Sequence, residues 1–419
     1  MLEKLLRIVI VTCLLFLAVA SDVASARTTL VQWDWFDRST KEGKTWWDYV
    51  EKTVEDKFGV DFILRPSPDI EVQFPVAMAA GVPVDAIQVS YRSSRAWSES
   101  GFLLPLNDYL KTSTISLSDF VPASLPPVTL GGKVYAIPWI ADFHVLMLSL
   151  DLFDAAGLDS AAAQTWDWNR FVEITRKLTR VDGSGRYQQV GYAADPGVET
   201  WWPWFYANGG KFFNDNETRA AFNSPEGVES LKFLNQLWNE YKVARGDFAN
   251  LNAFTKGQVG ILQTGPWMDN ELKGIAPDVR IDFAIFPKGP MGQKNATDVW
   301  VNYRAIPATT KRPDLAWKYL EWYNGSREVK YKVMGSHRSP YIPFYTSKAW
   351  VDSLVTQPQR RRFLAFLQSA QLQPLKAGPE WRGTVHDLVV QAILGQLSPS
   401  TALNQAEERV NAALAKVNK

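Results

Sequence analysis

The first 26 residues differ in character from the rest of the chain, and they decide where it folds. Two basic residues precede an apolar run over residues 8–20, and Ala24-Ser25-Ala26 has the small residues of a signal-peptide cleavage site. The run is too short for a membrane-spanning helix. We therefore predict that residues 1–26 are a cleaved signal peptide and that a mature chain beginning at Arg27 is exported to the periplasm. Export makes ATP and NAD poor candidates for a ligand, and we expect no cofactor.

The single cysteine, Cys13, lies inside the apolar run, so the predicted mature chain has no thiol. It can form no disulfide and no thiolate metal site. A lipid anchor on Cys13 is an alternative, but Thr12 before it and the apolar residues after it argue against one. The mature chain must then be stabilised by burial alone, which its length permits because the buried fraction of surface rises with chain length.

Charge and histidine content exclude several classes of function. The chain has 45 basic and 44 acidic residues, a net charge of +1, so nothing favours nucleic acid or an acidic membrane surface as a partner. Its 3 histidines, His144, His337 and His386, lack metal-ligand spacing, and we expect no metal site. The length is typical of two or three domains of about 150 residues each.

Strand and helix patterns alternate in the first part of the mature chain. Residues 29–32, 60–64 and 84–89 have the pattern of strands, and residues 46–58 repeat apolar side chains every fourth position. This alternation predicts a parallel sheet with both faces covered. Ligands of such sheets bind beyond the carboxyl ends of the strands. The residues that follow the first and third strands are Trp33, Asp34 and Trp35, and Tyr91 and Arg92.

The remainder of the chain continues the same pattern. Strands are predicted over residues 134–140 and 145–150, and helices over residues 168–178 and 398–414. Ser224-Pro225-Glu226 opens another helix, with serine as the N-cap, proline at the first helical position and an acid in the first turn. Residues 182–185 faintly suggest a calcium loop but lack its later ligands, so we predict a hairpin turn.

Six segments, in order, resemble the signatures of family 1 extracellular solute-binding proteins, the sugar-capturing components of ABC importers. The segments are GKVYAIP (132–138), DLFDAAGL (151–158), TWDWNRF (165–171), FTKGQVG leading to GPW (254–267), AWKYL (316–320) and SPSTAL (398–403). Each segment alone is weak evidence, but together they span nearly the whole mature chain. The chain is thus similar to the maltose-binding protein group.

The resemblance implies an α/β, two-lobed periplasmic binding protein fold of class II type, with a hinge and an interlobe ligand cleft. One lobe would comprise residues 27–141 plus 299–345, and the other residues 142–298 plus 346–419. Ligand binding would close the lobes about the hinge. A permease that prefers the closed form would then select loaded protein. The implied partners are a small carbohydrate and inner-membrane ABC importer permease subunits, and we expect the protein to be a monomer.

The resemblance also suggests which side chains bind ligand. A pyranose has an apolar face and a rim of hydroxyls, so its site needs flat aromatic rings together with acids and other hydrogen-bonding groups. Trp267 and Trp381 match stacking positions, one of Trp201 and Trp202 would face the cleft while Trp204 packs in the core, and Asp142 would accept sugar hydroxyls. Trp300 and Asn302 stand where many relatives have two glycines. Tyr91 and Arg92 would occupy a loop that contributes polar contacts in the family. The implied site comprises Trp33, Asp34, Trp35, Tyr91, Arg92, Asp142, Glu199, Trp201, Trp202, Trp267, Asn302, Trp381 and Arg382.

The abundance of tryptophan, 18 residues, favours a sugar of at least two rings. Two alternatives remain. Arg92, Arg304 and Arg382 suit a polyol phosphate such as glycerol phosphate, because arginine forks match phosphate oxygens. Asp142 and Glu199 could instead serve as the carboxylate pair of a secreted glycoside hydrolase. No nucleophile elbow, zinc motif or phosphate loop supports other catalysis, and we predict a binding protein with no catalytic residues.

Overall fold

A computed structural model describes residues 27–39, 41–325, 329, 354–355, 358–373 and 378–417. The chain divides into two compact units, and each is built from separate stretches of sequence. Unit 1 is Met1–Ile87 with Thr309–Tyr319, and unit 2 is Gln88–Ala308 with Leu320–Lys419. These units divide the chain at other residues than the lobes expected from the sequence, whose boundaries stay a prediction.

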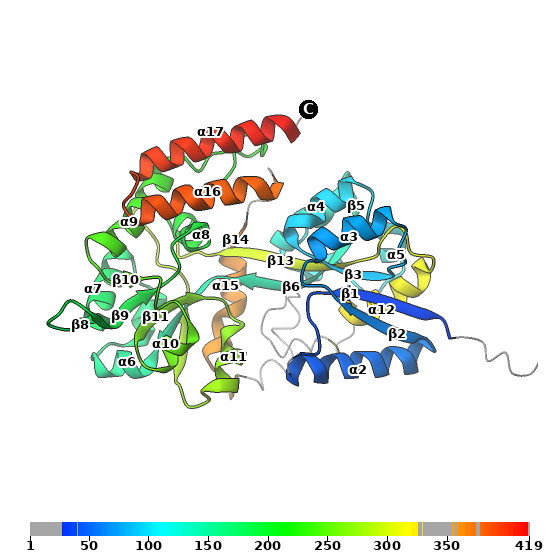
Figure 1. Ribbon diagram of the computed structural model, residues 1–419, viewed down its shortest axis with the longest axis horizontal. Helices are drawn as coiled ribbons and strands as arrows, with labels where there is room; N and C mark the ends of the chain where they lie inside the picture. The colour runs from blue at the N-terminus through cyan, green and yellow to red at the C-terminus, as the bar shows by residue number, and fades with distance from the viewer. Residues whose placement is uncertain are drawn as a thin grey trace, which may run out of the picture. The chain divides into compact units, whose positions relative to one another are not determined.

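Unit 1 is built on a parallel sheet in the strand order β2, β1, β3 (Figure 1). The parallel pairing confirms the sheet expected from the alternating pattern. The first helix covers it with the predicted apolar stripe: Val50 and Val54 are fully buried, and Trp47 stacks on Phe62 of β2 with ring centroids 6.3 Å apart. The elements are β1 (Thr29–Asp34), α2 (Lys41–Phe58), β2 (Asp61–Pro66), α3 (Ile70–Ala79) and β3 (Ala86–Val89), whose last two residues belong to unit 2.

Unit 2 contains a mixed sheet in the order β10, β9, β11, β7, β12, with β8 added on β9. Strand β9 is parallel to β10 and β11, whereas β7 is antiparallel to β11 and β12. All five residues of β7 are buried, as a strand enclosed on both faces requires. The bounds are β7 (Val145–Ser149), β8 (Arg180–Val181), β9 (Tyr187–Ala193), β10 (Ala244–Arg245), β11 (Val259–Thr264) and β12 (Ile281–Ala284).

A second group of strands in unit 2 positions the polar residues described below. Strand β6 runs antiparallel to β13, and β14 adds to the start of β13 in parallel. All eight residues of β6 are buried. These strands are β6 (Ala136–Phe143), β13 (Asp298–Ala305) and β14 (Gln371–Leu372), while β4 (Thr129–Leu130) and β5 (Lys133–Val134) form a small hairpin.

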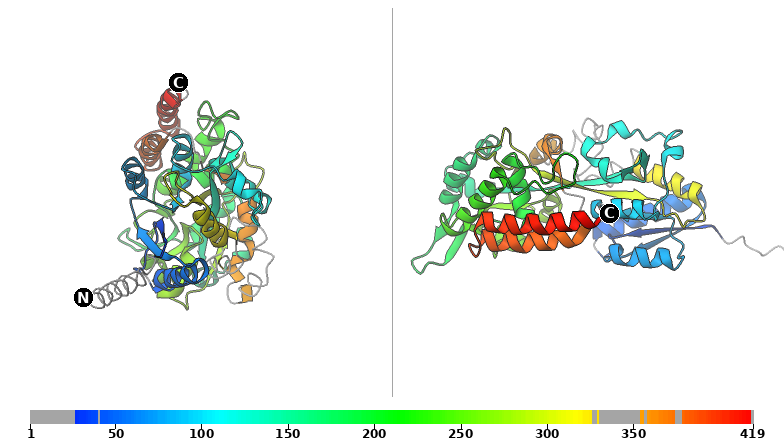
Figure 2. Two further views of the ribbon diagram at one scale, coloured as in Figure 1. Left: turned by 90° about the vertical axis from the view of Figure 1, so that its right-hand side faces the viewer. Right: turned by 90° about the horizontal axis from the view of Figure 1, so that it is seen from above.

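Helices surround these strands, and α16 and α17 lie side by side in all three views (Figures 1 and 2). The helices outside unit 1 are α4 (Tyr91–Glu99), α5 (Asn107–Leu110), α6 (Leu150–Ala155), α7 (Trp168–Leu178), α8 (Val198–Ala207), α9 (Pro225–Asn239), α10 (Leu251–Thr255), α11 (Met268–Ile275), α12 (Pro313–Gly325), which contains a boundary between the units, α15 (Phe363–Ser369), α16 (Gly378–Ile393) and α17 (Pro399–Val417). Short 3-10 helices are η1 (Leu117–Asp119), η2 (Pro122–Ser124), η3 (Pro126–Val128), η4 (Ser160–Gln164) and η6 (Pro358–Arg362).

The core of unit 2 is rich in aromatic rings. Trp168 stacks on Phe233 with centroids 4.2 Å apart, and Trp204 packs edge-on against Phe171 at 4.8 Å. The indole N–H of Trp204 donates to the hydroxyl of Tyr192 at 3.1 Å. Burial raises the pKa of the Tyr192 phenol, so its hydroxyl stays protonated inside this core. The predicted core position of Trp204 is therefore confirmed.

Local sequence signals gave several element boundaries correctly. Helix α7 has the predicted bounds, and α9 begins at Pro225 with the Ser224 hydroxyl accepting the N–H of Gly227 at 3.2 Å. The segment after β8 is a hairpin turn in which the Asp182 carboxylate accepts the N–H and hydroxyl of Ser184. These bonds lower the pKa of Asp182 to about 2.

One local prediction was wrong: Tyr91 and Arg92 are not in a loop. They are the first two residues of α4, because the Ser90 hydroxyl accepts the N–H of Ser93 and caps a helix there.

Among the described residues, no helix has both the length and the apolar character needed to cross a bilayer.

A buried ion pair joins η6 to α11 within unit 2. The side chains of Arg360 and Asp269 are each 2 % exposed, and their Nε and Oδ2 atoms are 2.5 Å apart. Gln359 donates to the other oxygen of Asp269 at 2.7 Å, and Arg360 also donates to Asn270 at 3.0 Å. Burial lowers the pKa of Arg360 to about 10, which reflects the cost of removing the guanidinium from water. Helix α11 is therefore anchored by a buried ion pair. If Arg360 or Asp269 were removed, the remaining charge would stay buried without its partner.

We expect Arg360→Met to lower the free energy of unfolding by about 3–5 kcal/mol, because it leaves the Asp269 carboxylate buried without its cation. The matched control is Arg361→Met in the same 3-10 helix. Arg361 is 42 % exposed and shares Asp282 with Arg362, so its loss should cost less than about 1 kcal/mol. Urea unfolding of residues 27–419 measures both changes, and equal losses in the two variants would contradict the prediction.

Candidate functional site

The antiparallel strands β6 and β13 bring together the polar residues of the candidate site. Asp142 of β6 lies opposite Trp300 of β13 in the register. Because side chains alternate along a strand, Asp298, Trp300 and Asn302 share one face of β13. Asp298 is fully buried, whereas Trp300 and Asn302 are half-buried. One face of β13 thus carries a buried acid, Asp298, followed by a partly accessible aromatic ring, Trp300, and a partly accessible amide, Asn302.

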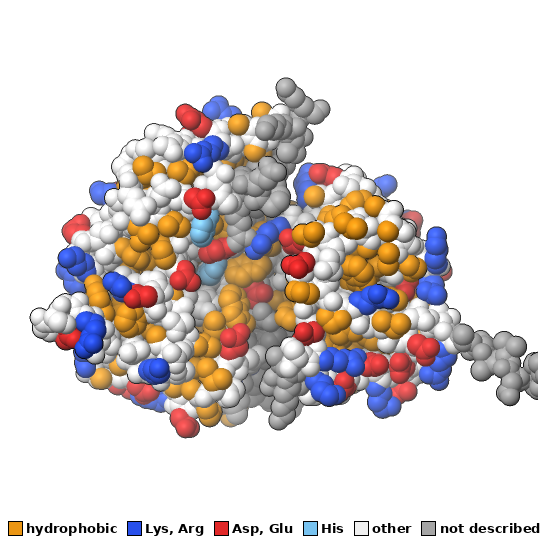
Figure 3. Space-filling model, viewed as in Figure 1, with side chains coloured by type: hydrophobic (Ala, Val, Ile, Leu, Met, Phe, Trp, Pro, Cys, Tyr) orange, Lys and Arg blue, Asp and Glu red, His pale blue; other side chains and the backbone are white. Residues whose placement is uncertain are grey.

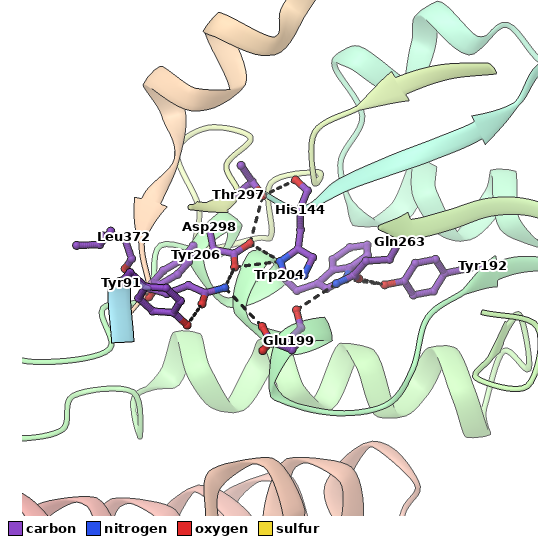
Figure 4. Close-up of polar contacts among 11 residues, drawn as sticks. Tyr91, His144, Tyr192, Glu199, Trp204, Tyr206, Gln263, Thr297, Asp298 and Leu372 are labelled. Atoms are coloured by element: carbon purple, nitrogen blue, oxygen red, sulfur yellow. Dashed lines mark hydrogen bonds and ion pairs between the residues drawn. The ribbon is translucent and has the colours of Figure 1, made fainter. Parts of the chain in front are cut away.

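His144, between β6 and β7, bonds to Asp298 (Figure 4). Its Nδ1 lies 2.8 Å from Oδ1 and 3.0 Å from Oδ2 of the carboxylate. The Thr297 hydroxyl donates to the backbone carbonyl of His144 at 2.7 Å, which fixes the main chain beside the ring. A carboxylate only accepts hydrogen bonds, so Nδ1 carries the proton. The other ring nitrogen, Nε2, is then an acceptor when the imidazole is neutral.

Gln373, directly after β14, joins Asp298 to residues of α8 and α4. Its amide nitrogen donates to Asp298 at 2.5 Å and lies 3.5 Å from the Glu199 carboxylate. Its amide oxygen accepts a short hydrogen bond from the hydroxyl of Tyr91 in α4. The backbone N–H of Gln373 donates to Val299 at 2.9 Å, so the side chain starts from a fixed position. Every polar atom of this amide is engaged in orienting the acids and the phenol.

Glu199 lies in the first turn of α8 and is half-buried. Its backbone carbonyl accepts the Gln263 amide at 3.2 Å. The positive end of the α8 dipole favours a carboxylate at this position. Gly197, just before the helix, lies against α16: a Cβ there would be 2.4 Å from Cε1 of His386. The close approach of His386 therefore requires glycine and ties α16 to the start of α8.

Two indole rings lie beside the polar cluster. The rings of His144 and Trp300 have centroids 5.0 Å apart, and Trp300 meets Trp267 edge-on at 6.0 Å. Trp267 is half-buried at the N-cap of α11 and its ring folds back over Gly265, where a Cβ would lie 1.7 Å from Cζ3. The Gly-Pro-Trp sequence thus sets the ring position, since no larger residue than glycine fits beneath it.

The charges of the cluster are mainly acidic. One ligand-type atom from each of His144, Glu199 and Asp298 lies within 4.8 Å of the others. The oxygens of Asp298, however, already accept from His144 and Gln373. Arg92, next to Tyr91 in the sequence, is exposed, and its Nε donates to the Tyr91 hydroxyl at 3.3 Å. This arrangement presents hydrogen-bonding groups and aromatic faces side by side.

The predicted residues of unit 1 lie at the end of β1. Trp33 is buried and packs edge-on against Phe74 at 6.4 Å. Asp34 is fully buried and accepts the Gln32 amide and the N–H of Phe36. Trp35 is half-buried. Only Trp35 of the three shows an appreciable accessible surface, and the ligand role of all three stays a prediction.

The other predicted residues fall into two groups. Trp201 and Trp202 are both enclosed in the core of unit 2, where the Trp201 indole donates to Ser230 at 2.8 Å. Trp381 and Arg382 belong to α16, but their side chains lie outside the described residues. Unit 2 brings together Tyr91, Arg92, Asp142, Glu199, Trp267 and Asn302 on the elements that carry the cluster.

Sequence reasoning missed His144, Asp298 and Gln373. The alternation of Asp298, Trp300 and Asn302 was a usable signal, because a polar residue every second position marks one strand face. His144 was considered only as a possible metal ligand. Gln373 carried no signal at all, since its partners lie 75 and 282 residues away in the sequence.

Comparisons with known proteins agree with this architecture. Residues 37–330 match the family model described as "Bacterial extracellular solute-binding protein". A binding protein of Brucella abortus (strain 2308) is 24 % identical over 96 % of both chains. The maltotriose-binding protein of Pyrococcus abyssi is 24 % identical over 77 % of this chain and 69 % of its own.

Solved structures resemble the whole described fold. An ABC substrate-binding protein from Listeria monocytogenes in complex with cycloalternan superposes with a TM-score of 0.79 at 20 % identity, covering 93 % of this chain and 99 % of that one. UgpB from Mycobacterium tuberculosis in complex with glycerophosphocholine gives 0.78 at 16 % identity, with the same coverages. The chain belongs to the bacterial extracellular solute-binding protein family. The expected α/β binding-protein fold is thereby confirmed.

We expect Gly265→Ala to displace the Trp267 ring, because the added methyl would occupy the position of Cζ3. The cost should be about 1–3 kcal/mol of unfolding free energy, as for other overpacked sites, with a change in the near-ultraviolet circular dichroism of tryptophan. Gly274→Ala in α11 is the control, since its Cβ would meet open space and should leave stability unchanged or raised by up to about 1 kcal/mol. Identical behaviour of the two variants would refute this account of the Gly-Pro-Trp turn.

Proposed function

We propose that this protein is the carbohydrate-binding component of an ABC importer. The observation that carries the proposal is the grouping of Trp267 and Trp300 with the hydrogen-bonded cluster of His144, Glu199 and Asp298. A sugar ring needs an aromatic face against its C–H groups and oriented acceptors and donors around its hydroxyls. We therefore propose that the sugar binds beside this cluster and the two rings.

The known ligands of similar proteins support a sugar as the ligand class. The Pyrococcus relative is named for maltotriose, and the Listeria structure holds cycloalternan. Both ligands are oligosaccharides. Together with the tryptophans beside the cluster, this favours an oligosaccharide over a single sugar for this chain. The relatives are binding proteins, so we propose capture without hydrolysis.

A polyol phosphate diester is the second candidate. UgpB, with glycerophosphocholine bound, has the same fold, and Arg92 is exposed beside Tyr91. Within the described part of the cluster, however, Glu199 and Asp298 supply acidic oxygens that would repel a phosphate. A neutral ligand with hydroxyl donors suits the acidic oxygens of Glu199 better.

Delivery would follow from the family to which the chain belongs. We propose that residues 1–26 direct export, that the mature monomer captures sugar in the periplasm, and that an inner-membrane permease receives it. Trp33, Asp34, Trp35, Trp381 and Arg382 remain proposed contributors, as does closure of the two lobes expected from the sequence.

The first test is thermal unfolding of residues 27–419 with maltose, maltotriose, lactose, mannitol and glycerophosphocholine, each separately. An oligosaccharide at about 100 times its dissociation constant should stabilise the protein by about 2.7 kcal/mol through preferential binding to the native state. Chromatography of the incubated sugar should reveal no products. A shift with glycerophosphocholine alone would select the phosphate diester, and released monosaccharide would replace the binding proposal with hydrolysis.

The second test concerns Trp267. We expect Trp267→Ala to weaken oligosaccharide binding by about 1–3 kcal/mol, the value of burying an aromatic side chain against ligand. Tyr187→Ala is the control, because Tyr187 lies on β9 under Arg245, with its ring 4.9 Å from the guanidinium, and takes no part in the cluster. Calorimetric titration of both folded variants measures the difference, and an unchanged affinity of Trp267→Ala would remove this ring from the site.

A further inference from the structure

The ring nitrogen Nε2 of His144 is not used by any described residue. The hydrogen bonds between this side chain and the described residues all involve Nδ1, which lies against Asp298, and the ring also packs near Trp300. The His144 side chain is 11 % exposed to solvent. Figure 3 places histidine side chains at the visible surface, near acidic ones. Among the described residues, Nε2 is therefore left without a hydrogen-bond partner while Nδ1 is fully engaged.

The protein fixes the direction and the proton of this imidazole. Asp298 is fully buried and is held by the Gln373 amide, whose oxygen is in turn held by Tyr91. This chain of bonds leaves the carboxylate able only to accept from Nδ1–H. The neutral ring then has its lone pair on Nε2, in the tautomer that a carboxylate partner selects. Asp298, Gln373 and Tyr91 together orient one acceptor.

We propose that His144 is a ligand-binding residue whose Nε2 accepts a hydrogen bond from a hydroxyl of the bound carbohydrate. Asp298, Gln373 and Tyr91 act as positioning residues for it. The inference rests on the proposed function, because it assigns one hydrogen bond of the same sugar site. Trp300, with its ring centroid 5.0 Å from the imidazole, lies close enough for a sugar to meet both groups. A hydrogen-bond acceptor suits a hydroxyl donor and not a phosphate oxygen, so Nε2 of His144 as an acceptor also selects among ligand classes.

A divalent cation held by His144, Glu199 and Asp298 is the competing occupant. The two carboxylates and the imidazole are suitable ligand types. The distances argue against a cation, because both oxygens of Asp298 lie within 3.0 Å of Nδ1 of His144. A metal bound to these atoms would have to break this hydrogen bond and remove the proton from Nδ1. The hydrogen-bonded arrangement is complete without a cation.

The test uses two substitutions that separate the ring nitrogens. In His144→Asn the side-chain amide can replace Nδ1 as donor to Asp298 but offers nothing at the position of Nε2. In His144→Gln the longer side chain returns a carbonyl acceptor near that position. We expect His144→Asn to weaken maltotriose binding by about tenfold to a hundredfold, because a buried ligand hydroxyl loses its acceptor. His144→Gln should recover most of that loss, and equal affinity of wild type and His144→Asn overturns the proposal.

A second readout needs no ligand. The chain has 3 histidines, so nitrogen-15 NMR of the free protein resolves their tautomers, with the His144 signals identified by their loss in His144→Asn. We expect His144 to carry its proton on Nδ1, and to carry it on Nε2 in a detectable fraction of Asp298→Asn, whose amide can donate to Nδ1. A wild-type ring protonated on Nε2 overturns the proposal even if maltotriose binds.

The remaining outcomes separate this inference from the proposed function. Maltose, lactose, mannitol and glycerophosphocholine are titrated into the same variants, and if none of the five probes binds wild type, both the sugar function and the ligand role of His144 fail, whatever the tautomer. If maltotriose binds wild type and His144→Asn alike, the function stands and only the role of His144 fails. Binding of Zn²⁺ to metal-free wild type that His144→Asn abolishes overturns the hydroxyl acceptor in favour of a cation.

Discussion

The burial of aromatic rings is the interaction on which unit 2 depends. The only cysteine of the chain precedes the predicted mature start, so no disulfide can close the structure. Trp168, Trp204 and Phe233 pack together between the sheet and its helices, and the Trp204 indole finds its hydrogen-bond partner in Tyr192. This core holds α8 in place, and α8 carries Glu199 at its first turn. Aromatic packing thus positions the Glu199 carboxylate without the help of a disulfide.

The polar cluster is built on the same rigid frame. Its residues begin or follow strands: Asp298 starts β13, His144 connects β6 to β7, and Gln373 follows β14. Strand ends leave side chains at a sheet edge while the backbone stays bonded, which favours accurate placement of a few polar groups. Asp298 can remain buried because the ring Nδ1–H of His144 and the side-chain amide of Gln373 both donate to its carboxylate. The acids therefore serve to orient neighbouring groups as well as to accept hydrogen bonds.

Local patterns and contacts between distant residues differed in what they revealed. Capping and periodicity gave α7, α9 and the hairpin at Asp182, because each depends on residues a few positions apart. The resemblance placed Tyr91 and Arg92 in a loop, although Ser90 was an available N-cap. Local patterns gave no means of separating Trp201, which bonds to Ser230 in the core, from Trp267, which folds over Gly265 beside Trp300. Which side of a helix or turn a tryptophan occupies depends on neighbours elsewhere in the chain.

The sequence by itself determined the class of protein, the alternation of strands and helices, and the residue types suited to sugar. It could do so because amphipathic periods, caps and ordered motifs are local in the chain. Only the tertiary structure decided which of these residues meet. The bonds from Asp298 to His144 and Gln373, and from Gln373 to Tyr91, span 154, 75 and 282 residues. No local rule links such positions, since their proximity follows from the pairing of β13 with β6 and β14.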